Sequence, residues 1–135
     1  MKKQVLLVAA VFVGSFILLS MTMIISNQQD PWDVPAKYQK MKNPYASALD
    51  EDKIGRILYA KHCKSCHGSK GKGDGTKAKS LDTPVGDFTD ASFKSQMDGS
   101  LYYKTFIGRD EMPSFMKKIP DEEEQWLVIN YIKGL

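Results

Sequence analysis

The sequence predicts an all-α protein in two parts, an apolar N-terminal helix followed by a small helical domain. Three stretches favour this fold class. Residues 5–25 are apolar and uncharged, residues 50–62 carry apolar side chains at helical spacing, and residues 126–132 are mostly apolar behind an acidic start. The 135 residues of the chain are enough for one ordinary domain and too few for two.

The N-terminal stretch, residues 5–25, is long enough to cross a membrane. As a helix, its 21 residues would span roughly 30 Å, the thickness of the hydrocarbon core of a bilayer. Lys2 and Lys3 precede it and favour a cytoplasmic N-terminus. A cleaved signal peptide is the alternative, but it usually has about 7–15 apolar residues and a small-x-small cleavage site, which residues 20–26 lack. We therefore expect residues 1–27 to be an uncleaved single-pass anchor that places the domain on the outer face of a bacterial cytoplasmic membrane.

Residues 28–46 separate this anchor from the domain. They contain three prolines among polar side chains, and such a stretch cannot hold a long helix. We expect an extended linker here and a folded domain over residues 47–135. Trp32 would lie either at the lipid headgroups or against the domain, and the sequence does not distinguish between the two.

Three helices are expected in the domain. Residues 50–62 form the first, with acidic side chains in its first turn, and residues 100–107 form the second, which ends at a glycine. Asp121 and Glu124 have the spacing of a capping box and mark the start of the third. The apolar residues 126–132 follow, so this last helix should be largely buried. The glycine-rich and proline-containing stretch between the first two helices is expected to be loop.

The motif that carries chemistry is Cys63-Lys64-Ser65-Cys66-His67, which has the C-x-x-C-H pattern of covalent haem attachment. Two thiols on one helical turn can each add to a haem vinyl group, and the adjacent histidine can bring a ring nitrogen to the iron. A thioredoxin-like pair would need a βαβ pattern around it, and none is visible. A zinc site needs four well-spread ligands, and a plain disulfide would leave the histidine unexplained.

The second axial ligand of the iron must come from later in the chain, on the opposite face of the haem. His62 lies on the attachment segment itself, so we expect it to be an exposed helix residue rather than a ligand. No histidine follows His67, and the domain and linker contain four methionines: Met41, Met97, Met112 and Met116. Met112 is the best candidate because Pro113 stiffens the polar loop that holds it. Met97 is the alternative.

From residue 47 to 135 the chain resembles the class I cytochrome c family. The resemblance rests on the C-x-x-C-H motif, the glycine-rich run at residues 68–75, the Met112-Pro113 pair and the closing helix at residues 126–131. It implies His67 as the proximal iron ligand and Met112 as the distal one. It also implies a small helical fold around one haem c, with the haem edge open to solvent and with Gly55 and Tyr131 in contact where the first and last helices cross.

Charge adds one further expectation. The net charge of +3 gives no case for binding nucleic acid, but the basic side chains cluster around the two cysteines. Residues 53–79 hold eight of them against a single acidic one: Lys53, Arg56, Lys61, Lys64, Lys70, Lys72, Lys77 and Lys79. This cluster is either an ordinary solvated surface or a docking surface for an acidic redox partner.

Together these features predict a one-electron carrier of a respiratory chain and not an enzyme, with no small-molecule substrate. The family resemblance implies a quinol-oxidising complex and a terminal oxidase or reductase as its membrane partners. A fixed cytochrome subunit of a larger membrane oxidoreductase complex is the alternative. If Met112 did not bind the iron, a ligand-binding or peroxidase-like haem protein would be the remaining possibility.

Overall fold

The computed structural model describes residues 31–135 of the chain. The anchor expected over residues 1–27, including the apolar stretch at residues 5–25, lies outside these described residues. Within them, no helix is long and apolar enough to cross a membrane.

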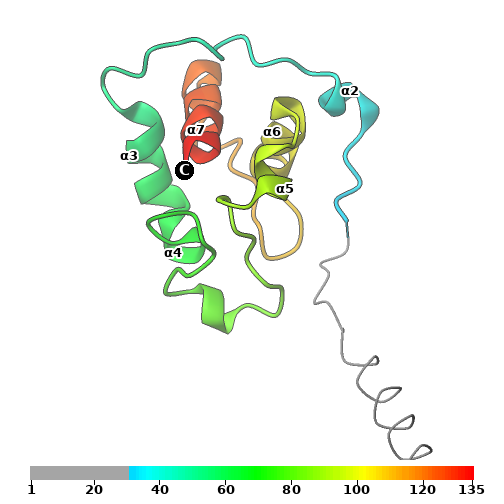
Figure 1. Cartoon of the computed structure of the whole chain (residues 1–135), viewed down its shortest axis with the longest axis vertical. Helices are drawn as coiled ribbons and strands as arrows, with labels where there is room; N and C mark the ends of the chain where they lie inside the picture. The colour runs from blue at the N-terminus through cyan, green and yellow to red at the C-terminus, as the bar shows by residue number, and fades with distance from the viewer. Residues whose placement is uncertain (1–30) are drawn as a thin grey trace, which may run out of the picture. The chain divides into compact units, whose positions relative to one another are not determined.

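The described part of the chain is helical, which confirms the predicted fold class for the domain. Its regular secondary structure consists of helices, and a single isolated β-bridge joins Arg109 to Met112. Three longer helices surround the core, and four shorter elements lie before or between them (Figure 1). The longer ones are α3 (Ile54–His62), α6 (Asp98–Phe106) and α7 (Glu122–Gly134), and the shorter ones are α2 (Ala36–Gln39), α4 (Lys64–His67), η1 (Ala78–Ser80) and α5 (Ala91–Lys94).

Helix α3 begins at Ile54, four residues later than the sequence predicts. Asp50 lies outside the helix, where its carboxylate accepts hydrogen bonds from the backbone N–H groups of Ile54 (2.6 Å) and Gly55 (2.9 Å). Lys53, the residue before the helix, has a φ of +58°, so the chain turns sharply there. Asp50, which the sequence placed in the first turn, therefore caps the helix instead. Its carboxylate satisfies N–H groups that have no partner within the helix.

Helices α3 and α7 lie beside each other and cross at close range, with α3 at one side of the domain (Figure 1). A Cβ atom on Gly55 would lie 2.3 Å from the carbonyl oxygen of Leu127 and 3.1 Å from the Cβ of Tyr131. The expected contact between Gly55 and Tyr131 is thus confirmed, and glycine is required because a side chain would collide with backbone. One turn further along, the rings of Tyr59 and Tyr131 lie 5.2 Å apart.

Helix α7 supplies the centre of the core. Asp121 caps it by accepting a hydrogen bond from the backbone N–H of Glu124 (3.0 Å), as the sequence predicts. Residues 125–129 of α7 are all buried. They pack against α3, α6 and the segment between α6 and α7. The buried apolar side chains of this core include Leu101, Phe106, Phe115, Ile119 and Trp126.

Residues 31–46 differ from the predicted extended linker. They contain helix α2, and the compact unit of the domain begins at Pro31 rather than at residue 47. Val34 is buried, and the ring of Tyr38 packs 4.8 Å from that of Tyr103 on α6. The prolines do exclude a long helix, but the apolar and aromatic side chains between them are more stable against α6 than in water. We call residues 31–46 the arm.

Replacing Gly55 by alanine is expected to destabilise the folded domain by about 1–3 kcal/mol, because the new methyl group must push α3 away from the Leu127 carbonyl. Gly134→Ala is the matched control, since nothing lies within 4 Å of the methyl group it would add to α7. Guanidinium unfolding of the haem-loaded protein measures both. A Gly55→Ala variant as stable as the control would contradict the close crossing.

Candidate functional site

The C-x-x-C-H motif forms one continuous turn at the end of α3. Cys63 donates its backbone N–H to the carbonyl of Tyr59 (2.9 Å), and its own carbonyl accepts from Cys66 (3.1 Å) and His67 (3.0 Å). Both cysteines are unpaired thiols. The two sulfur atoms and the imidazole therefore belong to one rigid turn, which is the arrangement that two-point attachment of a haem requires.

The glycine-rich loop after His67 wraps around this turn and fixes it. Backbone N–H groups of the loop donate to the carbonyls of His67, Cys66 and Ser65, at 2.9 to 3.0 Å. A Cβ atom on Gly75 would lie 2.4 Å from the Ser65 carbonyl oxygen, so only glycine permits the loop to approach so closely. The predicted loop therefore turns tightly beside the attachment motif, because its glycines permit close approach.

Tyr59 ties the same turn to the core. Its hydroxyl is buried and donates a 2.6 Å hydrogen bond to the carbonyl of Gly68, directly after His67. Burial raises the pKa of Tyr59 well above its ordinary value, so the hydroxyl keeps its proton and remains a donor. The position of the turn therefore depends on the packing of α3 against α7.

His67 lies in an aromatic environment that favours its neutral form. Its ring stacks on Phe88 with centroids 4.4 Å apart, and Phe88 stacks on Phe93 at 4.5 Å. Burial lowers the pKa of His67 to about 4, so a lone pair is available for a metal at neutral pH. Its Nδ1 is buried and has no hydrogen-bond partner among the described residues, a situation that is costly unless another group meets the ring.

The two thiols differ in exposure. Cys63 is 7% exposed and belongs to the core cluster, whereas Cys66 is half-buried. Burial raises the pKa of Cys63 to about 12, and such a thiol stays protonated at neutral pH. A group bonded to Cys63 would thus lie against the apolar core, and one bonded to Cys66 would lie closer to solvent.

His62 is less exposed than the sequence predicts. It is half-buried, its ring meets that of Phe115 edge-on at 6.0 Å, and its Nε2 is buried without a hydrogen-bond partner in the described part of the chain. Burial lowers its pKa, and the positive charges of Lys61 and Lys118 add to this effect. The expectation of an exposed residue failed because the segment after α6, which no local pattern places, covers this end of α3.

Met112 lies in a short hairpin between α6 and α7. Arg109 and Met112 exchange two backbone hydrogen bonds of 2.8 Å each, and Asp110 between them has a φ of +49°. The Met112 side chain is partly buried and packs against the core cluster. Of the other three methionines, Met97 and Met116 are exposed and Met41 packs on the core from the arm. Met112 as the distal ligand thus remains a prediction, and the hydrogen-bonded hairpin supports it.

Two side chains that precede Met112 fasten the hairpin to other segments. The carboxylate of Glu111 accepts backbone hydrogen bonds from Thr83 (2.8 Å) and Asp82 (3.2 Å), which lower its pKa and hold the hairpin to the loop at residues 81–83. The side chain of Arg109 contacts the arm, where its guanidinium lies 4.3 Å from the centre of the Trp32 ring. Sequence reasoning identified neither anchor, because both join segments that are far apart in the chain.

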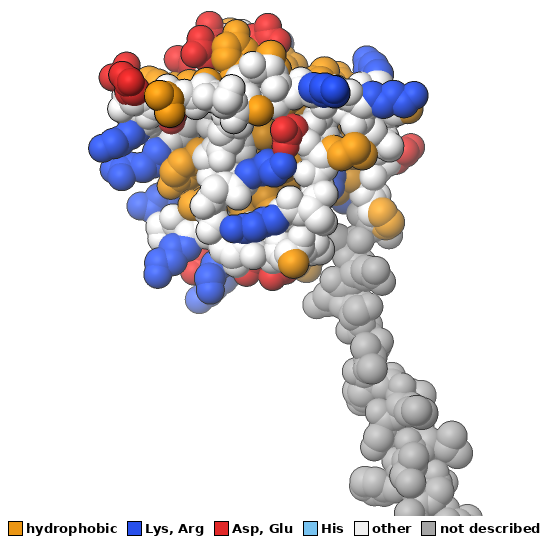
Figure 2. Space-filling view, turned by 45° about the horizontal axis from the view of Figure 1, so that its top comes forward, with side chains coloured by type: hydrophobic (Ala, Val, Ile, Leu, Met, Phe, Trp, Pro, Cys, Tyr) orange, Lys and Arg blue, Asp and Glu red, His pale blue; other side chains and the backbone are white. Residues whose placement is uncertain are grey.

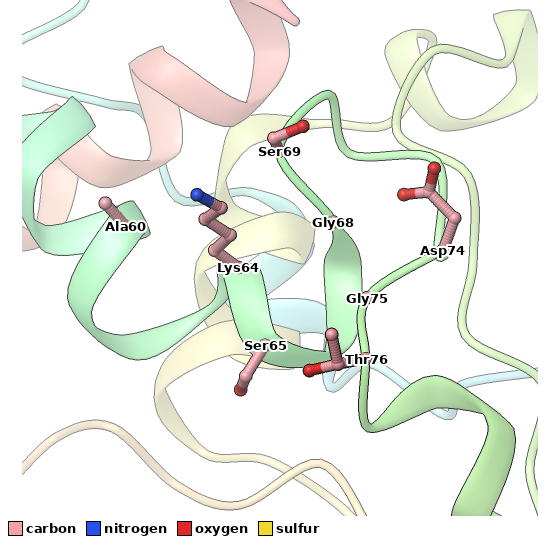
Figure 3. Close-up of a pocket in the computed structure, with 8 residues that line it drawn as sticks. All are labelled: Ala60, Lys64, Ser65, Gly68, Ser69, Asp74, Gly75 and Thr76. Atoms are coloured by element: carbon pink, nitrogen blue, oxygen red, sulfur yellow. The ribbon is translucent and has the colours of Figure 1, made fainter.

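A surface hollow of about 360 Å³ lies beside the attachment turn, between α4 and the glycine-rich loop (Figure 3). In the close-up, Lys64 and Asp74 stand on opposite sides of it. It is lined by small and polar residues, and none of Cys63, Cys66, His67 and Met112 lines it. The hollow is therefore separate from the groups that could hold a haem.

The arrangement of these residues fits a covalently attached haem. Two unpaired thiols and a neutral imidazole share one fixed turn, apolar and aromatic side chains surround them, and a thioether is held in a hairpin elsewhere on the same core. This fold and this site are those of a c-type cytochrome domain.

The comparison with protein families is in agreement. A family model described as cytochrome C oxidase, cbb3-type, subunit III matches residues 50–132, and the chain belongs to this family. Membership implies covalently bound haem c with iron and a role in haem-based electron transfer. No curated protein matches the chain at a significant level.

Removing both thiols is expected to abolish covalent attachment of the haem, because the chain has only two cysteines. Cys63→Ser and Cys66→Ser alone should each leave one thioether bond. Haem staining after denaturing electrophoresis distinguishes attached from lost haem, and the α-band of the pyridine complex distinguishes one bond from two. Ser65→Ala, an exposed change in the same turn, is the control and should stain like wild type. Haem retained by the double variant would contradict the assignment.

Proposed function

We propose that this protein is a one-electron carrier of a respiratory chain, with haem c attached through Cys63 and Cys66 and its iron bound by His67 and Met112. The observation that carries the proposal is the fixed C-x-x-C-H turn with unpaired thiols. Bound haem supplies an iron that alternates between Fe(II) and Fe(III). The residues of the chain determine which of these states is preferred and how easily water or other ligands approach.

Each proposed ligand has a definite effect. The thioether of Met112 stabilises the reduced state and so raises the reduction potential. The neutral ring of His67, which belongs to the attachment turn and stacks on Phe88, would hold the iron from a position that its surroundings fix. If His67 and Met112 both bound the iron, the chain would leave no ligand position open for a substrate, which favours a carrier over an enzyme.

The basic surface supports a negatively charged redox partner. The eight Lys and Arg side chains of residues 53–79 are all exposed, and basic side chains gather at the side of the domain that carries α3 and α4 (Figure 2). This surface borders the attachment turn, where an electron would leave or arrive. We infer docking to membrane redox complexes, such as a quinol-oxidising complex and a terminal oxidase or reductase, through attraction between opposite charges.

The proposed membrane location is supported by the N-terminal sequence alone. The apolar stretch at residues 5–25 and the two lysines before it support a single-pass anchor, with the haem domain on the outer face of a bacterial cytoplasmic membrane. A tether to the membrane would raise the effective concentration of the carrier beside its partners.

A fixed subunit of a membrane oxidoreductase complex is the second candidate. The description of the matching family as an oxidase subunit favours it. Purification in mild detergent separates the two roles, because a subunit stays with its complex and a carrier does not. A ligand-binding or peroxidase-like role is disfavoured by the hairpin that fixes Met112.

Met112→Ala is expected to convert the haem iron from low spin to high spin or to lower its midpoint potential sharply, because the thioether that favours Fe(II) is lost. Potentiometric titration of the optical spectrum measures this in the full-length, haem-loaded protein, which should itself be low spin and indifferent to carbon monoxide. Met97→Ala and Met116→Ala are the controls, since both side chains are exposed. A wild-type protein that binds carbon monoxide readily would overturn the proposed ligation and favour the ligand-binding role.

Reversing charge on the basic surface is expected to slow oxidation of the reduced protein by ferricyanide, which is an anion, and high salt should reduce the difference. The variant is Lys61→Glu with Lys64→Glu, and the control is Lys37→Glu with Lys40→Glu on the arm. All four lysines are exposed, and both double variants change the net charge equally. Stopped-flow rates that fall by the same factor in both would show that only total charge matters.

A further inference from the structure

Arg109 connects the arm to the Met112 hairpin. Its guanidinium lies 4.3 Å from the centre of the Trp32 ring, and its Nη1 donates a 3.2 Å hydrogen bond to the carbonyl of Pro31. Trp32 is held in turn by Tyr103 of α6, whose ring it meets edge-on at 6.4 Å. The side chain of Arg109 therefore lies against an aromatic ring that is itself packed on the domain.

The backbone of the same residue holds Met112. Arg109 and Met112 are joined by both hydrogen bonds of the hairpin, so Arg109 cannot move far without moving the Met112 peptide. The carboxylate of Asp110 lies 3.4 Å from Nε of Arg109, but Asp110 belongs to the hairpin and is largely exposed. It can orient the guanidinium, but it cannot fasten the hairpin to the rest of the domain.

The carboxylate of Glu111 and the hydroxyl of Ser114, which donates a 2.6 Å hydrogen bond to the carbonyl of Phe106, also hold the hairpin. Asp110, Glu111 and Pro113 are exposed, and a segment with few buried contacts opens more easily than the core. The arm, by contrast, is well anchored. Val34 is buried, and the ring of Tyr38 packs 4.8 Å from that of Tyr103 on α6. The contact between arm and hairpin thus joins a buried element to a more exposed one, and it adds to the hydrogen bonds of Glu111 and Ser114.

We propose that Trp32 and Arg109 are positioning residues for the distal iron ligand: the arm holds the Met112 hairpin closed and so determines how readily an outside ligand displaces Met112. This inference rests on the proposed ligation of the iron by Met112. It gives the arm a function beyond connecting the domain to the N-terminal stretch.

The size of the effect follows from the contact itself. A cation–π pair contributes about 0.5 kcal/mol when exposed and about 2 kcal/mol when desolvated, which corresponds to a change of about two- to thirtyfold in an equilibrium constant. Loss of the pair would raise the population of the open hairpin by this factor. An exogenous ligand that binds only when Met112 is displaced gains the same factor in apparent affinity.

Imidazole binding to the oxidised, haem-loaded, full-length protein tests the proposal. Trp32→Ala is the deciding variant, because it removes the ring without changing a charge near the haem. We expect it to raise the apparent affinity for imidazole about two- to thirtyfold and to lower the midpoint potential. Arg109→Gln should act in the same direction, Arg109→Lys should restore part of the wild-type behaviour, and Trp32→Ala combined with Arg109→Gln should add little to either single change.

Asn43→Ala is the matched control within the arm. It removes the 2.7 Å hydrogen bond between Asn43 and Asn130 of α7 and does not touch the hairpin. It should leave imidazole affinity and midpoint potential unchanged, even if the thermal midpoint falls. An equal rise in imidazole affinity in Asn43→Ala would show that the arm acts only through general stability and would overturn the positioning role.

Two further outcomes are distinguishable. Unchanged imidazole affinity in Trp32→Ala, in a protein whose Met112→Ala variant binds imidazole much more tightly than wild type, would overturn the proposal and leave the ligation by Met112 intact. If Met112→Ala itself binds imidazole no more tightly than wild type, Met112 is not the ligand. The proposed ligation then fails, and the inference drawn from it fails as well.

Discussion

The contact between α3 and α7 at Gly55 is the constraint on which the rest of the domain depends. Because Gly55 has no side chain, the backbone of α3 lies directly against the Leu127 carbonyl, and the Tyr59 and Tyr131 rings meet one turn later. The Tyr59 hydroxyl then reaches the carbonyl of Gly68 and holds the end of the attachment turn. The geometry of the two thiols and the imidazole is thus fixed from within the core, through backbone contact and one buried hydrogen bond.

The two proposed iron ligands are held in different ways. His67 belongs to a turn in which backbone hydrogen bonds, the glycine-rich loop and aromatic packing all act together. Met112 belongs to a hairpin whose neighbouring residues are mostly exposed, and the side chains of Arg109, Glu111 and Ser114 fasten it to other segments. A rigid proximal side and a more easily opened distal side would suit a carrier whose potential can respond to its surroundings. The proposed positioning role of the arm concerns this distal side, because Trp32 contacts Arg109.

Local sequence patterns predicted the elements whose causes are local. The start of α7 follows from the capping pair Asp121 and Glu124. The end of α6 follows from the preference of glycine for positions just after a helix. The loop character of the glycine-rich run follows from its composition. Errors arose where a distant segment decides the outcome. Asp50 caps α3 instead of joining it, the segment near Phe115 covers His62, and aromatic residues of the arm pack on α6 where polarity and prolines predicted an extended linker.

The sequence by itself determined that the chain carries haem c. Attachment needs two thiols and an imidazole within one turn, and five consecutive residues specify all of this. It also predicted Met112 as the distal ligand, since a proline beside a loop methionine is a local feature. Only the tertiary structure decided what holds Met112 in place, because Trp32 and Arg109 are 77 positions apart and meet only once the arm has folded onto α6. Such a contact has no period or spacing in the chain, and packing alone creates it.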